Sequence, residues 1–185
     1  MRRRVRLLLL PAAVLLASLV GGTSPGWAAS ASQLNRDGAA ALRRLYASQA
    51  SARTLGKTAR RILVFPSIVK AGFMFGGQLG EGVMFRGSKP VGYYNSVAAS
   101  YGLQAGVQKF GYALFFMNDA AVRQLDDTGG FEVGVGPSVV VVDEGMGKSI
   151  TSNTVTSDVY AFIFSQKGLM AGMGIQGSKI TRIDK

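Results

Sequence analysis

Hydrophobic residues recur every three or four positions in the first part of this chain. Across residues 33–47 the apolar positions are Leu34, Ala41, Leu42, Leu45 and Tyr46, and arginines occupy the other side of the same helical wheel. This pattern predicts an amphipathic helix with a basic face over residues 33–47.

A second helical pattern follows a break rich in Ser and Ala. Its apolar positions are Ala52, Leu55, Ala59 and Ile62, and its basic positions have the same spacing. Gly56 lies inside this pattern and weakens a helix by roughly 1 kcal/mol relative to Ala. The sequence therefore predicts two consecutive amphipathic helices with basic faces.

Beyond Ile62 the sequence pattern changes to short runs of β-branched or aromatic residues separated by glycine, which is typical of strands. These runs are Ile62–Phe65, Gly72–Phe75, Val91–Tyr94, Tyr112–Phe116, Val139–Val142 and Val159–Phe164. No helix of crossover length alternates with them, so an antiparallel sheet is favoured over a doubly wound parallel one. One short internal helix is expected at residues 118–125, where Asn118 can cap the helix and Ala121, Val122 and Leu125 face inward.

Glycine is unusually frequent in the strand region. Beyond residue 28 the chain has 22 of its 25 glycines, about twice the typical frequency, and glycines within strands mark bends and close backbone approach. The expected fold is α+β: a glycine-rich, coiled antiparallel β-sheet or small barrel, packed with the N-terminal amphipathic helices and one short internal helix. The runs at 139–142 and 159–164 are apolar on both faces, so a helix, a second layer or bound lipid must cover each face.

Residues 1–28 have the pattern of a secretory signal peptide. Four arginines precede an apolar run from Leu7 to Val20, and small residues follow near Ala28. The run is shorter than the roughly 20 residues of a bilayer span, which favours a cleaved signal over a permanent anchor. We expect one exported domain over residues 29–185, periplasmic or secreted and peripherally associated with a membrane.

The net positive charge of that domain is confined to one stretch. Ser32 to Lys70 has eight basic residues and a single acid, Asp37, whereas Ala71 to Lys185 has nine basic and nine acidic residues. Such localisation indicates contact with an anionic surface. The candidate lipid-binding residues are Arg43, Arg44, Arg53, Lys57, Arg60, Arg61 and Lys70.

Charge alone gives weak membrane binding. Each Lys or Arg near an anionic leaflet contributes about 1 kcal/mol, so a stripe of four gives roughly 4 kcal/mol and a millimolar dissociation constant. Tighter binding needs apolar insertion as well, for which Leu42, Leu45 and Tyr46 are candidates, or an acyl chain taken into the sheet.

The composition argues against an enzyme. The chain has no Cys and no His, which removes disulfides, thiolate sites and the commonest general base and metal ligand. The paired acids Asp126–Asp127 and Asp143–Glu144 stand beside glycine, where solvated turn residues are the ordinary case. Gly172, Gly174 and Gly177 match a dinucleotide fingerprint in spacing, but only eight residues follow them. We expect no catalytic residues, metal, cofactor or nucleic-acid partner.

Several separate blocks of sequence resemble one known family. The blocks are Leu63–Pro66 with Lys70–Phe73, Gly92–Asn95, Gly134–Pro137, Asp158–Phe162 and Lys167–Gly172. Together they resemble the SYLF domain in its bacterial secreted form, over residues 33–183. The resemblance implies a phospholipid-binding module: eukaryotic relatives bind phosphoinositides, in part through an amphipathic N-terminal segment, and some bind actin, whereas bacterial relatives are regarded as envelope lipid-binding proteins.

Two alternatives remain open at this point. The basic face could dock an acidic protein or polymer of the envelope, and glycine-rich strands in an exported chain could form an integral outer-membrane barrel. The barrel is disfavoured because the chain ends in Ile183, Asp184 and Lys185 rather than an aromatic residue, and because regular ten-residue alternation is missing.

Overall fold

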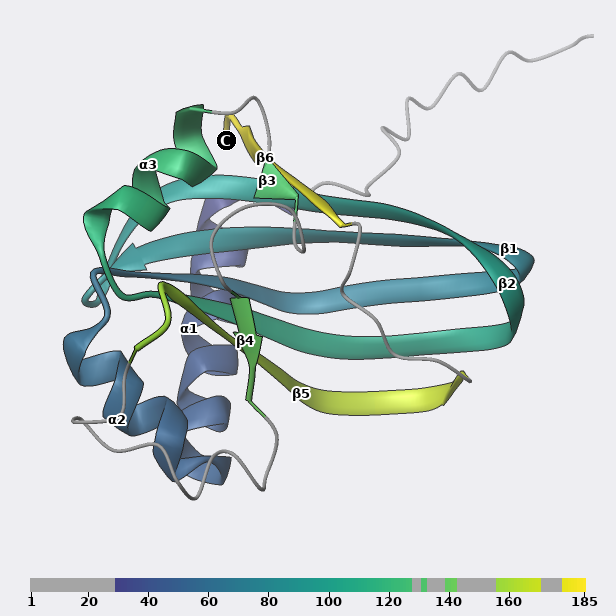
Figure 1. The fold of residues 1–185 in the computed structure, drawn as a ribbon, viewed down its shortest axis with the longest axis horizontal. Coiled ribbons are helices and arrows are strands. Elements are labelled where there is room, and N and C mark those ends of the chain that lie inside the picture. Colours follow the sequence, from purple (N-terminus) through teal and green to yellow (C-terminus); the bar gives the residue numbers. More distant parts are fainter. Residues whose placement is uncertain (1–28, 128–130, 133–138, 143–155, 171–177) are drawn as a thin grey trace, which may run out of the picture.

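The computed structural model describes residues 29–127, 131–132, 139–142, 156–170 and 178–185. Its elements are arranged as a curled sheet with helices on both of its faces (Figure 1). The expected signal peptide at residues 1–28, the acids Asp143 and Glu144, and the glycines at 172, 174 and 177 lie outside the described residues.

Both N-terminal helices form where the apolar periodicity predicts them. Helix α1 spans Ala31–Ser48 and begins at Ser30, whose hydroxyl accepts a hydrogen bond from the Gln33 amide at 3.2 Å. Helix α2 spans Ala50–Thr58 and ends sooner than its pattern suggested, because Ala59 is extended and Arg61 already belongs to a strand.

The internal helix α3 spans Asp119–Asp127. Asn118 caps it as predicted, since the side-chain oxygen accepts the Ala121 amide hydrogen at 2.9 Å. Ala121 and Leu125 are buried, and Val122 packs against the same core. The local sequence signal was therefore sufficient for this element.

Six described strands form one sheet. They are β1 Arg61–Arg86, β2 Lys89–Phe116, β3 Phe131–Glu132, β4 Val139–Val141, β5 Val159–Met170 and β6 Lys179–Ile183. Neighbouring strands in the order β3-β6-β2-β5-β4 are hydrogen-bonded to each other. Strand β1 lies outside this order and pairs with β2. The α+β expectation is confirmed, with two corrections: β4 pairs with β5 in parallel, and the sheet curls into a half-barrel whose described strands do not close into a barrel.

Strands β1 and β2 form one long antiparallel ribbon that bends back on itself. The predicted runs at 62–65 and 72–75 belong to the same strand, and those at 91–94 and 112–116 belong to its partner. A bulge between Phe73 and Phe75 marks the bend, where a Cβ on Gly72 would meet the Phe75 carbonyl oxygen at 2.7 Å. The bend lies at the right-hand end of Figure 1, far from α2.

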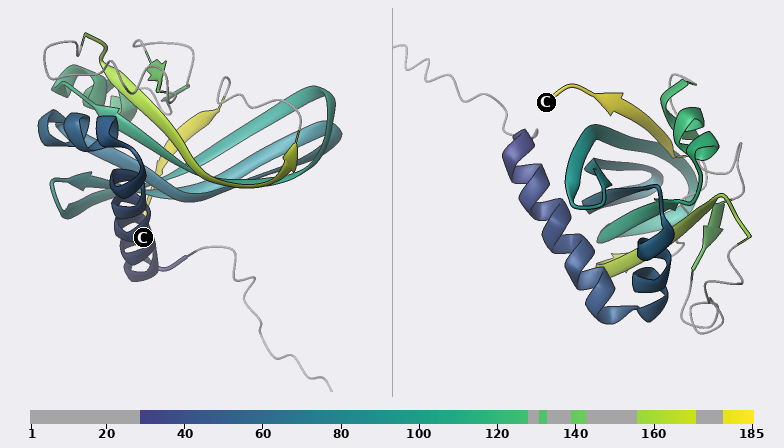
Figure 2. Two further views of the ribbon diagram at one scale, coloured as in Figure 1. Left: turned by 90° about the horizontal axis from the view of Figure 1, so that it is seen from below. Right: turned by 90° about the vertical axis from the view of Figure 1, so that its left-hand side faces the viewer.

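The bend divides the ribbon into two halves with different surroundings. We call residues 61–68, 81–86, 89–96 and 110–116 the helix-covered half and residues 69–80 and 97–109 the distal half. In the helix-covered half both faces are buried: one face packs with α3 around Phe65, Tyr112 and Leu114, and the other packs beneath α1 and α2 around Phe115 and Phe162. The two views in Figure 2 show α1 against the outside of the curl and α3 on the opposite side of the sheet.

Candidate functional site

The predicted basic residues do not all reach one surface. Arg43 and Arg44 on α1, Arg53 and Lys57 on α2, and Arg60 after it are exposed. The two salt bridges in the described part of the chain involve none of them. We call these five exposed positions together the basic helix surface.

Arg61 and Lys70 do not belong to the basic helix surface. Arg61 is half-buried in β1, and its guanidinium donates to the Arg60 carbonyl at 2.7 Å. Lys70 is buried in the distal half of the ribbon, at 8 % exposure. The apolar pattern predicts too long a second helix, because Ile62 follows Ala59 at helical spacing although β1 begins at Arg61.

The apolar face of α1 packs on the sheet. Leu45 is fully buried, and Leu42 and Tyr46 pack against the same core. The Tyr46 ring lies 6.3 Å from that of Phe115, and Gly38 allows the helix to approach Val83 so closely that a Cβ would collide with it. These apolar residues are already used by the fold, so α1 offers mainly charge to a partner.

A shallow hollow of about 610 Å³ lies beside α1. Arg36 and Arg43 line it together with Asn35, Asp37, the turn residue Ser88, and Pro90 at the start of β2. Arg36 donates to the Gln33 side chain at 2.6 Å, and Gln33 donates to Asp37 at 2.8 Å. The hollow is therefore basic at its rim and open to solvent.

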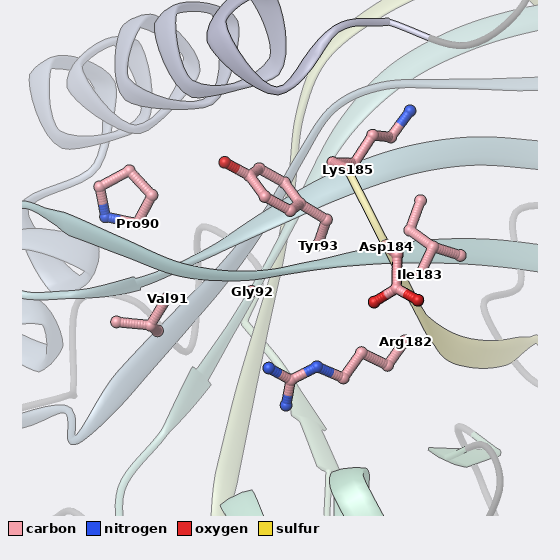
Figure 3. A pocket seen from close by; sticks show the side chains of 8 residues that line it. All are labelled: Pro90, Val91, Gly92, Tyr93, Arg182, Ile183, Asp184 and Lys185. Carbon is pink, nitrogen blue, oxygen red and sulfur yellow. The ribbon is translucent and has the colours of Figure 1, made fainter.

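A second, smaller hollow of about 260 Å³ lies between the start of β2 and the C-terminus (Figure 3). Tyr93, Arg182 and Asp184 line it. Lys185 also lines it, but its ammonium group donates to Glu81 at 2.7 Å and to the Ala29 carbonyl at 2.7 Å. These contacts bind the C-terminus to β1 and to the start of α1, which is a structural role.

Asp126, one of the paired acids, stabilises the fold. Its carboxylate accepts the Tyr94 hydroxyl hydrogen at 2.7 Å and lies 3.5 Å from the Arg182 guanidinium. Burial, and then the hydrogen bond to Asp126, hold the pKa of Tyr94 well above its usual value. This arrangement connects α3 to β2 and β6.

Within the described ranges there is no group of three or more acidic side chains that could hold a metal ion. Nor is any described helix long and apolar enough to cross a membrane.

Sequence reasoning missed an exposed apolar surface on the distal half of the ribbon. Val69, Phe75, Leu79, Val97 and Val107 are all exposed there. The signal that could have found it is alternation, because polar Lys70, Gln78 and Gln108 are each a neighbour of one of these residues in sequence. Knowing which residues face outward, however, requires the register of the folded ribbon.

Comparison with known proteins relates the chain to one family. A family model for Ysc84, described as a Las17-binding protein actin regulator, matches residues 97–185, from within β2 to the C-terminus. Protein YSC84 of Saccharomyces cerevisiae is 29 % identical over 126 residues, which are 64 % of this chain and 27 % of the yeast protein. The chain spans about a quarter of the length of that relative. Residues 97–185, together with the motif blocks of β1, β2 and β5, are therefore similar to the SYLF domain of the Ysc84 family.

Proposed function

We propose that this protein is an exported, non-catalytic domain that binds anionic phospholipid membranes through its basic helix surface. The observation that carries the proposal is the exposure of Arg43, Arg44, Arg53, Lys57 and Arg60 on two consecutive helices and the residue after them. The neighbouring acid, Asp37, is already hydrogen-bonded to Gln33. A surface of one sign attracts polyanions over about one Debye length.

Anionic lipid suits this surface better than a small anion does. The basic side chains are spread along two helices and an open hollow, which is the geometry of a planar contact rather than of an enclosed site. Phosphatidylglycerol or cardiolipin would supply the negative charge in a bacterial envelope. Each cation at the leaflet contributes about 1 kcal/mol, so the contact is reversible and sensitive to salt.

The experiment is flotation of the purified protein with vesicles of graded phosphatidylglycerol content, at low and at physiological salt. Reversing Arg43→Glu, Arg53→Glu and Lys57→Glu together removes at least about 3 kcal/mol of attraction, or roughly 100-fold in vesicle affinity. The matched control reverses three exposed bases outside α1 and α2, namely Arg86, Lys89 and Arg123. Equal binding by the two triple variants would refute the assignment to the basic helix surface.

A second function is favoured by the family description, which names a Las17-binding actin regulator. On that proposal the same cations dock an acidic protein or polymer. Protein-free vesicles separate the two functions, since binding to purified lipid needs no other partner. The docking function would be supported if the protein bound no vesicle of any composition but bound an acidic protein, and if charge reversal abolished that binding.

Export is a separate part of the proposal, supported by the signal-like residues 1–28. Its test is the mass of the protein recovered from an exporting bacterial host. Cleavage near Ala28 supports export, and recovery of the uncleaved chain from the cytosol refutes it.

A further inference from the structure

The distal half of the ribbon has an apolar outer face that no described element covers. Five of the six large apolar side chains exposed in the described chain lie there, with exposures from 44 % for Val69 to 70 % for Phe75; the sixth, Val141, is on β4. Scattered exposed apolar residues are normal, but a concentrated group marks an interaction site.

The strand register places these side chains on the outer side of the ribbon, with Leu79 and Val97 on one limb of the bend and Val69 and Val107 on the other. Leu79 is directly opposite Val97, and Val107 is opposite Ala71, two residues beyond Val69. Side chains alternate between faces along a strand, so Val107 lies on the same side of β2 as Phe115, which is covered by the helices. The apolar face therefore continues past the edge of α1 and α2 into solvent.

Polar side chains are buried on the opposite face of the ribbon, among the positions whose side chains the structure describes. Gln78, Ser96 and Gln108 are each at most 6 % exposed there or at its border. The Gln78 Nε2, Ser96 Oγ and Gln108 Oε1 atoms are buried without a hydrogen-bond partner. A sheet in water normally has apolar residues inside and polar residues outside. The described side chains of the distal half have the reverse pattern, which is found where strands face lipid.

Lysines border the apolar face. Lys109 lies directly opposite Lys167 on exposed positions of β2 and β5, and exposed Lys179 lies opposite Val97. Like charges directly opposite each other destabilise a strand pair. Residues 69–80 and 97–109 contain no Asp or Glu. An anionic partner would relieve this repulsion.

We propose that the distal half of the ribbon inserts its outer face into the interfacial layer of an anionic phospholipid bilayer. Leu79, Val97 and Val107 enter the boundary between headgroups and acyl chains, and Lys109, Lys167 and Lys179 contact lipid phosphates. The inference rests on the proposed function and adds the apolar contact that α1 does not provide. Insertion is shallow, roughly 5–10 Å, because unpaired backbone groups of edge strands are not tolerated deeper in hydrocarbon.

Charge favours a bilayer over a second copy of this chain. In a two-fold dimer the same face meets itself, so the lysines of one copy would be brought against those of the other. Like-charge juxtaposition at an interface is strongly unfavourable. An anionic bilayer instead matches both parts of this face, because its acyl chains suit the apolar centre and its headgroups suit the basic border.

The test uses the absence of cysteine from the chain. Single substitutions Leu79→Cys and Val107→Cys are labelled with the fluorophore NBD; Val141→Cys on β4 is the control, since that position is also exposed. Each protein is mixed with phosphatidylcholine vesicles containing graded phosphatidylglycerol, with brominated lipids as depth quenchers. We expect a blue shift and bromine quenching at positions 79 and 107, and neither change at position 141.

The outcomes separate this inference from the proposed function. Wild-type protein that floats with vesicles while probes 79 and 107 stay in water overturns the inference and leaves the function standing. Protein that does not float with any vesicle overturns both. A blue shift that needs no vesicles and grows with protein concentration shows self-association and overturns the inference.

Substitution gives an independent readout. Leu79→Gln and Val107→Thr together should lower vesicle affinity by about tenfold or more, because each removes apolar area from the lipid contact. The control Val141→Thr should leave affinity unchanged. Unchanged affinity in the double variant, alongside lost affinity in the Arg43, Arg53 and Lys57 reversal, would assign membrane contact to the helices alone.

Discussion

Phe115 and Val107 lie on the same face of the same strand, yet one is fully buried and the other is 60 % exposed. The difference is the cover: α1 and α2 pack over the helix-covered half of the ribbon and end before its distal half begins. Hydrogen bonding between β1 and β2 continues through both halves, apart from the bulges. One backbone ribbon thus carries a conventional core at one end and an uncovered apolar face at the other.

The comparison separates residues that hold the fold from residues that are available to a partner. In the helix-covered half, apolar burial on both faces supplies the stability. In the distal half, stability comes mainly from the strand ladders, and the outer side chains contribute little to it. Substitutions on the shared face should therefore affect stability at one end and binding at the other.

The strongest test of this division is Phe115→Ala. Its ring meets that of Phe162 edge-on at 5.0 Å and is also close to Tyr46. Truncation leaves a cavity under both helices and should lower the free energy of unfolding by about 3–5 kcal/mol. Urea denaturation measures the change, and a loss below about 1 kcal/mol would show that the helices do not form a tight cover.

Enlarging a side chain between α1 and the sheet should also weaken the packing of this helix. Gly38→Val places a branched side chain where even a Cβ would collide with Val83 and lie 3.3 Å from the Phe85 ring. Overpacking of this kind typically destabilises a protein by about 1–3 kcal/mol. Ala47→Val on the exposed side of α1 is the control, with an expected loss below about 0.7 kcal/mol from helix propensity.

The helices of the cover were predictable from sequence because their signals are local. Leu34, Ala41 and Leu45 define one face of α1, and Asn118 fixes the start of α3. The sequence could not show that Leu45 packs on the sheet, since a membrane and a sheet accept the same amphipathic helix. That choice depends on Gly38 and Val83, which are far apart in the chain.

The arrangement of the distal half was not predictable either, because it depends on contacts between residues that are far apart in the chain. Local patterns indicated strands at 62–65 and 72–75, but joining them into one strand depends on the bend at Gly72. The pairing of Leu79 with Val97 determines which side chains share a face, and it is a contact between different strands. The charge pattern predicted Lys70 as a binding residue, but the fold buries that residue and exposes Lys109 and Lys167 instead.

Two buried tyrosines in the helix-covered half should differ in how their replacement by Phe changes stability, and both effects should be smaller. Tyr94→Phe removes the hydrogen bond to Asp126 and should lower stability by about 1–2 kcal/mol. Tyr112→Phe should be neutral or stabilising, because the Tyr112 hydroxyl is buried without a hydrogen-bond partner. Thermal unfolding at neutral pH measures both, and equal destabilisation would contradict the assigned difference.

The same tyrosines should contribute to a loss of stability at alkaline pH. Burial raises the pKa of both phenols above the ordinary value of 10.0 that they regain on unfolding. The folded state then holds protons that the unfolded state releases, so their contribution is present below about pH 10 and is lost as the pH rises beyond it. Either Phe substitution should flatten the fall in unfolding free energy above about pH 10, and an unchanged slope in both would contradict the burial effect.

The smallest expected effect on stability is also the sharpest test of the comparison. Val107→Thr keeps the side-chain shape and β-propensity, and at an exposed position it should change the free energy of unfolding by less than about 0.5 kcal/mol. The same replacement at buried Val83, beneath α1, places an unpaired hydroxyl in the core and should lower stability by about 1–3 kcal/mol. Denaturation of the two variants side by side compares one chemical change at two points on the same face. If Val107→Thr destabilised the fold as much as Val83→Thr, the distal apolar face would be part of the core, and its use as a membrane contact would have to be abandoned.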